Sequence, residues 1–316
     1  MILIAGATSQ IGRAVVERLA ATQDVRVFVR RPEDAKAFRE LGCDVVQGDV
    51  RDQEAVQRAC DGTGAVLSLI GRHFARTERG FWDVDYEGNV KLIDAAKQAG
   101  VRRFVLLSAL WSDRNPGPVI FRVKRKTEDH LLASGLDYAI LRPATFVSGP
   151  SSLIGILGPT IERWGLAVIP RPDSKPISFI SLEDLAEALV NAALAQRLGN
   201  RILELSGAEA ITLGQGAERI ANRLGKRARL IRLPRWVLRV LRPLARLLGF
   251  GAYEAILFYE MLADDGFCVG PEAAVTREVL GRDPTPVDAM IDRYYRDHAR
   301  TAWRDSFYGT LVFHAS

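Results

Sequence analysis

The chain has 316 residues, 48% of them apolar and 26% charged, so it can bury a large core in one large or two modest domains. Its three cysteines are far apart, odd in number and without metal-ligand spacing, which favours reduced, buried thiols over a disulfide framework or a metal site. The longest uncharged run, residues 144–161, contains prolines, glycines and serines and predicts no membrane-spanning helix. The first apolar strand follows Met1 directly, without a signal sequence before it, so we expect a cytoplasmic protein.

Residues 1–145 alternate short apolar runs with amphipathic segments, which is typical of a parallel sheet with crossover helices. The predicted strands are Ile2–Ala5, Val25–Val29, Asp44–Gln47, Ala65–Leu69, Arg103–Ser108 and Tyr138–Leu141. The helices expected between them are Gly12–Ala21, Pro32–Leu41, Gln53–Cys60, Trp82–Ala99 and Lys124–Ser134. We predict an α/β fold, a Rossmann-like doubly wound parallel sheet, for this region.

The rhythm changes beyond Pro143, where residues 144–161 are expected to form an uncharged loop. A capping pattern at Ser181 opens a predicted helix, Leu182–Ala195, and a strand is expected at Arg201–Leu205, so residues 177–208 are predicted to return to the sheet. After Gly207 the pattern is helical throughout. Residues 146–316 are therefore predicted to be a smaller, mainly helical substrate or partner region, and no role is assigned to residues 304–316.

The segment AGATSQIG, residues 5–12, follows a strand and opens a helix, which is the context that makes a glycine pattern informative. Gly6 would allow a tight turn, Gly12 would allow close packing of the helix on the strand, and free N–H groups at the helix start would hold a pyrophosphate. The alternative is a tight turn without a ligand. The candidate cofactor-binding residues here are Gly6, Thr8, Ser9, Gln10, Ile11 and Gly12.

The second strand ends in Arg30 and Arg31, with no acidic residue at its tip. An acid at this place binds a free ribose 2′-hydroxyl, whereas arginine suits a 2′-phosphate, so the sequence favours NADP(H) over NAD(H). Both arginines could instead be a solvated surface pair. Asp49, followed by Val50, could accept a hydrogen bond from the adenine amino group or could cap the next helix. Leu69, at the end of the fourth strand, completes the set of candidate cofactor-binding residues.

Several motifs together resemble the atypical short-chain dehydrogenase/reductases, and they cover roughly residues 1–208. They are GATSQIG, VRR, GDVRD, AAKQAGVRRFVLLS, a Lys-x-x-x-Glu pair and SGLDYAILRP. Within this family the chain is most similar to the NmrA-like and Ycf39-like groups, the latter known from photosystem assembly, and more distantly to the 39-kDa accessory subunit of respiratory complex I. The resemblance implies a Rossmann-like NAD(P)-binding fold.

Departures from the family pattern bear on the chemistry. Ser9 stands where the family has its second loop glycine, and Asp85 stands where extended members usually carry an asparagine. The family's Tyr-x-x-x-Lys reads Ile120 to Lys124, so the phenol that exchanges a proton with substrate is replaced. We expect either that Lys124 acts alone as acid or base, as the resemblance to isoflavone-reductase-like proteins implies, or that it only holds the nicotinamide ribose. Ser108 is the second candidate catalytic residue, or else a strand-end hydroxyl bonded to backbone.

Residues 230–249 form a basic amphipathic segment, LIRLPRWVLRVLRPLARLLG. From Lys226 to Arg246 there are eight basic residues and no acidic one. The segment could lie on a membrane surface or bind a membrane-associated protein, or its apolar face could be core with solvated arginines. Nucleic-acid binding is not expected, because no recognised module accompanies the charge.

Two functions follow from this sequence. The first is a dinucleotide-bound assembly factor or redox sensor that docks on a membrane-associated partner, which rests on Ile120 and the basic segment. The second is an NADPH-dependent reductase of a quinone-like or flavin-like acceptor, which rests on the loop and Lys124. Direct hydride transfer to such an acceptor needs less proton chemistry than reduction of a ketone.

Overall fold

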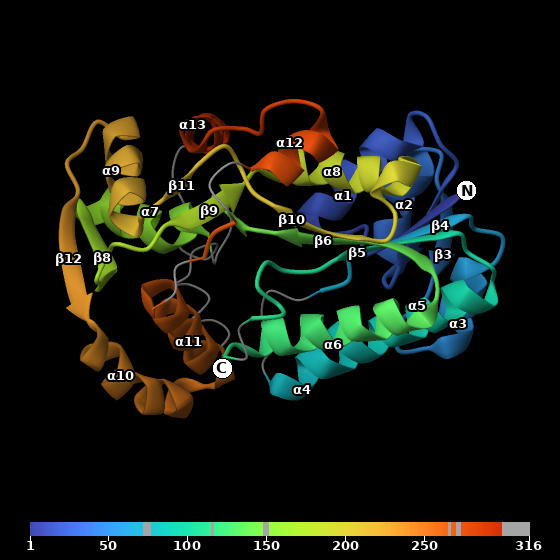
Figure 1. The fold of residues 1–316 in the computed structure, drawn as a ribbon, viewed down its shortest axis with the longest axis horizontal. Helices are drawn as coiled ribbons and strands as arrows, with labels where there is room; N and C mark the ends of the chain where they lie inside the picture. Colours follow the sequence, from blue (N-terminus) through green and yellow to red (C-terminus); the bar gives the residue numbers. More distant parts are fainter. Residues whose placement is uncertain (72–76, 115–116, 148–151, 265–266, 270–272, 299–316) are drawn as a thin grey trace.

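The structure is a computed structural model, and it describes residues 1–71, 77–114, 117–147, 152–264, 267–269 and 273–298. A seven-stranded parallel sheet forms its centre, in the order β10-β6-β5-β4-β1-β2-β3 (Figure 1). The strands are β1 (Ile2–Ala5), β2 (Val25–Val29), β3 (Asp44–Gln47), β4 (Ala65–Ser68), β5 (Arg103–Leu107), β6 (Asp137–Pro143) and β10 (Arg201–Leu205). This sheet confirms the predicted Rossmann-like fold.

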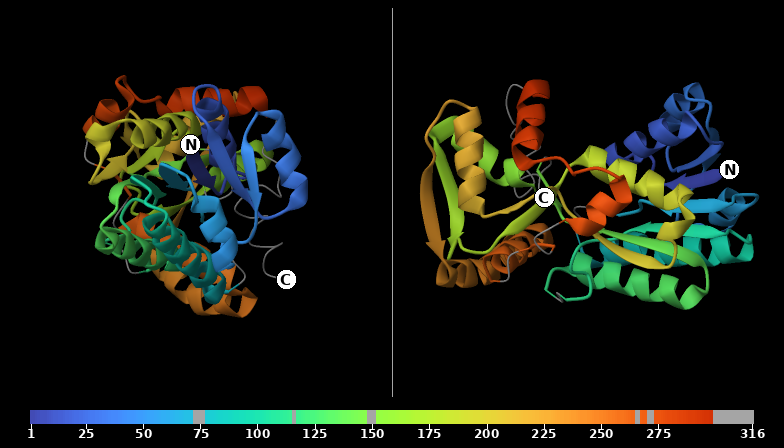
Figure 2. Two further views of the ribbon diagram at one scale, coloured as in Figure 1. Left: turned by 90° about the vertical axis from the view of Figure 1, so that its right-hand side faces the viewer. Right: turned by 45° about the horizontal axis from the view of Figure 1, so that its top comes forward.

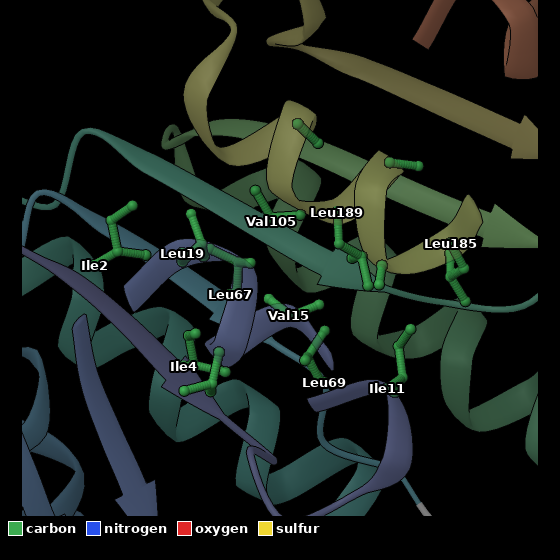
Figure 3. Packing of buried hydrophobic residues seen from close by; sticks show 14 of the residues in the cluster. Ile2, Ile4, Ile11, Val15, Leu19, Leu67, Leu69, Val105, Leu185 and Leu189 are labelled. Carbon is green, nitrogen blue, oxygen red and sulfur yellow. The ribbon is translucent and has the colours of Figure 1, made fainter. Parts of the chain in front are cut away.

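Helices cover both faces of the central sheet. One face carries α1 (Gln10–Ala20), α2 (Pro32–Glu40), α8 (Leu182–Leu194) and α12 (Ala274–Leu280); the other carries α3 (Gln53–Cys60), α5 (Glu87–Gln98) and α6 (Val119–Ser134). Figure 3 shows the first face, where side chains of α1 and α8 pack on Ile4, Leu67 and Val105 of the strands. The burial of strand residues on both faces explains their nearly continuous apolar sequences.

A second lobe lies beyond the carboxyl ends of the strands (Figures 1 and 2). The chain enters it directly from β6 through β7 (Thr145–Phe146). The lobe contains the sheet β11-β9-β7, with β9 (Ile177–Ile180) and β11 (Ala210–Ile211), and a parallel pair of β8 (Leu166–Arg171) and β12 (Arg229–Pro234). Its helices are α7 (Leu153–Trp164), α9 (Leu213–Arg223), α10 (Arg235–Leu248), α11 (Phe250–Asp264) and α13 (Val287–Asp297). The segment 177–208 is thus divided: β9 belongs to this lobe, whereas α8 and β10 belong to the central sheet.

Three details differ from the sequence prediction. Part of the expected loop 144–161 is the helix α7, which Ser152 caps and whose residues Leu153–Ile161 are all buried. The chain after Gly207 is not entirely helical, because β12 pairs with β8, a partner about sixty residues earlier that local periodicity cannot reveal. The predicted helix Trp82–Ala99 starts as α4 (Glu78–Phe81), continues as a π-helix over Trp82–Tyr86 and becomes α5.

Two other observations concern the described part of the chain. None of its helices combines the length and the apolar character needed to cross a bilayer. Within the same residues, no group of three histidine, cysteine, aspartate or glutamate side chains is arranged to hold a metal ion. Residues 304–316, to which the sequence assigned no role, lie outside the described residues.

Candidate functional site

The two loop glycines are held in place by the backbone around them. Gly6 has a φ of +93°, and a Cβ there would lie 2.7 Å from the carbonyl carbon and oxygen of Leu69. At Gly12 a Cβ would lie 2.3 Å from the carbonyl oxygen of Gly6, far inside contact distance. Neither position accepts a side chain unless the backbone moves. The structure therefore brings Gly6, Gly12 and Leu69 together at the carboxyl ends of β1 and β4.

Ser9 replaces the family's second glycine without strain, because its φ is −70° and its ψ is 161°. It is the N-cap of α1: its Oγ accepts a hydrogen bond from the Gly12 N–H at 3.0 Å and donates one to the Gly6 carbonyl at 3.0 Å. Thr8, Ser9 and Gln10 are exposed, whereas the Ile11 side chain is in the core. No acidic residue occupies the first turn of α1, so this exposed helix start suits the pyrophosphate of a dinucleotide.

The two arginines after β2 have different surroundings. Arg31 is the N-cap residue of α2, and its Nε lies 3.0 Å from Asp34 Oδ2 and 3.6 Å from Glu33 Oε1. Arg30 is exposed and makes no ion pair within the described ranges, and its charge helps to lower the pKa of Asp49. Of the two, Arg30 has the guanidinium that is available to a ligand.

Asp49 is engaged by the next arginine along the chain. Arg51 Nη2 lies 2.7 Å from Asp49 Oδ2, and this hydrogen bond is the main reason why the pKa of Asp49 falls to about 2. Asp52 caps α3, so the alternative that Asp49 caps this helix is wrong. The Val50 side chain packs on α5, because a Cβ at Gly88 would lie 2.8 Å from Val50 Cγ2. An adenine amino group at this edge could donate to the ionised carboxylate of Asp49, which already accepts a hydrogen bond from Arg51.

Lys124 is buried on α6 with its amine between two strand ends. Its Nζ donates to the carbonyls of Ile70 at 3.1 Å and Leu107 at 3.0 Å. Burial lowers the pKa of Lys124, and the charges of Asp85 and Glu128 partly oppose this shift. The amine is therefore easier to deprotonate than an exposed lysine.

Asp85 lies near Lys124, a proximity that the sequence analysis did not predict. A Cβ at Gly71 would lie 3.1 Å from Lys124 Nζ and 3.3 Å from Asp85 Oδ1, so the two charged groups flank the backbone of Gly71. Asp85 is fully buried within the π-helix, a local widening that often occurs at functional sites. Its departure from the family pattern was the available signal, but the helix geometry was needed to place it.

Ser108 uses its hydroxyl within the protein. Its Oγ donates to Glu128 Oε1 at 2.5 Å, and Ser112 donates to the same oxygen at 2.9 Å. Glu128 is fully buried and is paired with Arg142, whose Nη2 lies 2.6 Å from Oε2. Arg142 also contacts Asp113 at 2.9 Å, and these two carboxylates raise its pKa despite its burial. The alternative that Ser108 bonds only to backbone is therefore wrong: the side chain of Glu128 holds it.

Ile120 stands at the position of the family's tyrosine, and its side chain packs against other apolar residues. It is half-buried and contacts both the core of the second lobe and a small cluster containing Phe81, Val119 and Val123. The N-terminus of α6 is tied to the second lobe as well, because the Val119 N–H donates to Glu254 Oε2 of α11 at 2.7 Å. The helix that carries Lys124 thus packs on the central sheet and contacts the second lobe at its N-terminus.

These groups limit what the site can do. A dinucleotide bound along the strand ends would supply a hydride, and the chain would supply the amine of Lys124 and the N–H groups at the start of α1. Ile120 stands in place of the family's tyrosine four residues before Lys124, and the hydroxyl of Ser108 is already donated to Glu128. The arrangement suits binding of the dinucleotide, or hydride transfer to an acceptor that needs little proton transfer from side chains.

Comparisons with known proteins agree with this geometry. A sequence profile described as NAD(P)H-binding matches residues 6–195. The chain is 27% identical to the photosystem II assembly factor Ycf39 of Synechocystis sp., over 93% of this chain and 90% of that protein. It is 32% identical to the ceramide reductase of Caulobacter vibrioides, over 74% of each.

A solved structure shares the fold. The NADPH-dependent quinone oxidoreductase QOR2 from Escherichia coli, complexed with NADPH, superposes with a TM-score of 0.78 at 23% identity and covers 93% of this chain and 100% of that one. This likeness shows the fold, and the similarity to Ycf39 of Synechocystis confirms the resemblance to Ycf39-like proteins.

Proposed function

Because this chain belongs to the NAD(P)H-binding family, we propose that it is an NADP(H)-bound assembly factor or redox sensor with a degenerate Tyr-x-x-x-Lys site. The observation that carries the proposal is the hydrogen bond from Ser108 to buried Glu128, together with a half-buried Ile120 at the sequence position of the tyrosine. The side chains that would exchange a proton with an alcohol or ketone are replaced or engaged. The assembly function named for Ycf39 of Synechocystis supports this choice.

The preference for NADP(H) rests on Arg30. Its exposed guanidinium at the end of β2 can bind a ribose 2′-phosphate, whereas Arg31 is occupied by Asp34. Calorimetric titration should show tighter binding of NADPH than of NADH. Arg30→Ala should weaken NADPH binding about tenfold, or about 1.4 kcal/mol, and leave NADH binding unchanged. Arg31→Ala is the matched control and should have a smaller effect; equal NADPH and NADH affinities would refute the preference.

The second candidate function is an NADPH-dependent reductase of a quinone-like or flavin-like acceptor. Lys124 favours the reductase function, because burial lowers the pKa of its amine. The amine also lies at the strand ends, where a nicotinamide would bind. The fold shared with QOR2 and the identity to a ceramide reductase add support.

Turnover separates the two functions. If the protein is a reductase, NADPH oxidation with a panel of quinones should be measurable and should disappear in Lys124→Ala. Lys126→Ala changes an exposed lysine on the same helix and should keep the rate. Absence of turnover in a protein that binds NADPH would leave the assembly or sensor function. In that function we propose a location peripheral to a membrane, through the basic segment of residues 230–249.

A further inference from the structure

Helix α10 presents apolar side chains to the solvent. Trp236 is 66% exposed, Val240 56%, Leu244 52% and Leu247 84%. Their spacing of four, four and three residues places them in one stripe along the helix. Exposed apolar side chains are common singly, but a continuous stripe marks an interaction surface. We call these four residues the α10 stripe.

The opposite side of α10 is the side that packs on the protein. Leu238 and Ala245 are each 4% exposed, and Arg242 of this helix pairs with Glu260 of α11 at 3.3 Å. Arg246 lies over the ring of Tyr253, with 5.5 Å from its Cζ to the ring centroid. The sequence-based alternative, an apolar face that is core, is therefore wrong for the α10 stripe. Figure 1 shows α10 at the lower left periphery of the second lobe, with α11 beside it.

Positive charge flanks the α10 stripe. Arg235, Arg239, Arg242 and Arg246 follow one another at spacings of four, three and four residues, next to the stripe on the helix surface. Arg239 is exposed and makes no ion pair with any residue that the structure describes. Arg232, on β12 directly before α10, is likewise exposed. An exposed apolar stripe beside a row of arginines complements a surface that is apolar inside and negatively charged outside.

We propose that the α10 stripe docks this protein on the surface of an anionic lipid bilayer. Trp236, Val240, Leu244 and Leu247 would enter the boundary between headgroups and acyl chains, and the exposed Arg232 and Arg239 would lie at the level of the phosphates. Tryptophan is favoured at this depth because its ring is amphipathic. The inference rests on the proposed function and deepens it by naming the partner as lipid.

The docked helix is connected to the candidate active site. α11 packs on α10, and its Glu254 caps the N-terminus of α6, the helix of Lys124. Phe250, at the start of α11, lies 6.3 Å from Phe81 between ring centroids. A bilayer bound at α10 would therefore hold the Lys124 helix at a fixed distance from the membrane, where an apolar acceptor or a membrane protein is found.

Co-sedimentation with vesicles tests the proposal on the full chain. Phosphatidylcholine vesicles with 30% phosphatidylglycerol are compared with pure phosphatidylcholine vesicles at about 0.15 M salt. We expect binding to the anionic vesicles only, weakened by added salt. Leu244→Asp should reduce vesicle binding at least about tenfold, because it places a charge in the stripe. Arg239→Gln should reduce it about fivefold.

Matched controls use other exposed residues. Leu132→Asp changes a leucine that is 37% exposed on α6, and Arg58→Gln changes an exposed arginine on α3; both should bind vesicles like the unmodified protein. Calorimetric titration with NADPH on each variant shows that the fold and the dinucleotide site are intact. Loss of vesicle binding with normal NADPH binding supports the proposal, whereas absence of NADPH binding in the unmodified protein counts against the proposed function alone.

Three results would overturn the proposal. One is no binding to either kind of vesicle. Another is equal binding to both kinds, because the arginines would then have no role. The third is a lipid-free dimer, seen by sedimentation velocity and abolished by Leu244→Asp, because the α10 stripe would then be covered by a second copy of this chain.

Discussion

The two ends of the candidate cofactor site depend on different parts of the protein, the backbone at one end and side chains at the other. At the loop end, Gly6 and Gly12 allow close backbone contacts, and Thr8, Ser9 and Gln10 are exposed. At the lysine end, Ser108, Glu128 and Arg142 are buried and bonded to one another. Binding of a dinucleotide depends mostly on backbone, whereas proton transfer depends on particular side chains. One end can therefore keep its role while the other changes.

The largest expected effect is at the lysine end, in stability. Glu128→Leu leaves the Arg142 guanidinium, which is 3% exposed, without its main partner, and loss of one member of a buried ion pair costs about 3–5 kcal/mol. Urea unfolding measures the change. Asp113→Asn removes a carboxylate on the same arginine that is 29% exposed and should cost less. A loss below about 1 kcal/mol for Glu128→Leu would mean that the buried network is not structural.

The loop end should respond through ligand binding instead. In Gly12→Ala the new Cβ would meet the Gly6 carbonyl oxygen at 2.3 Å, so α1 must shift away from β1. We expect NADPH affinity to fall at least about 100-fold, or about 2.7 kcal/mol. Gly64→Ala is the control, because its nearest contact is 3.4 Å from a flexible arginine. Unchanged affinity in Gly12→Ala would show that the dinucleotide does not use this loop.

A smaller effect is expected at Asp49, whose partner is solvated. Arg51 is 61% exposed, so solvent screens the pair, and Asp49→Asn should cost about 0.5–1 kcal/mol at pH 7. The folded pKa of about 2 lies below the usual 3.8, so the contribution is present above pH 3.8 and is lost as the pH falls through about 2. Unfolding of the two proteins should converge over this interval. A gap that widens on acidification would contradict the assignment.

The smallest effect is expected when the tyrosine is restored. Ile120→Tyr supplies a phenol four residues before Lys124, yet Ser108 stays bonded to Glu128. We expect no measurable ketone reduction with NADPH and a stability change within about 1 kcal/mol. Appearance of ketone reductase activity would show that the lysine end lacks only its phenol. The difference between the two ends would then lie in the single residue Ile120.

Much of the fold could be predicted because it depends on local pattern. The predicted strands of residues 1–145 all lie within two residues of those observed, since buried parallel strands have short apolar sequences between glycine turns. The prediction of a loop over residues 153–161 is wrong, because it gave the proline and two glycines of this segment more weight than its apolar residues. β12 was missed because its partner, β8, is distant in sequence. Local pattern is informative only where the neighbours that stabilise an element are also local.

The sequence by itself determined the glycine loop, the arginines after β2 and the absence of the tyrosine at Ile120, because each is a matter of residue type at a fixed spacing. Only the tertiary structure decided that Ser108 belongs to Glu128, that Asp85 stands beside Lys124 and that the α10 stripe faces outward. These relations join residues far apart in the chain or depend on which side of a helix is covered. Packing creates them, and no local pattern encodes them.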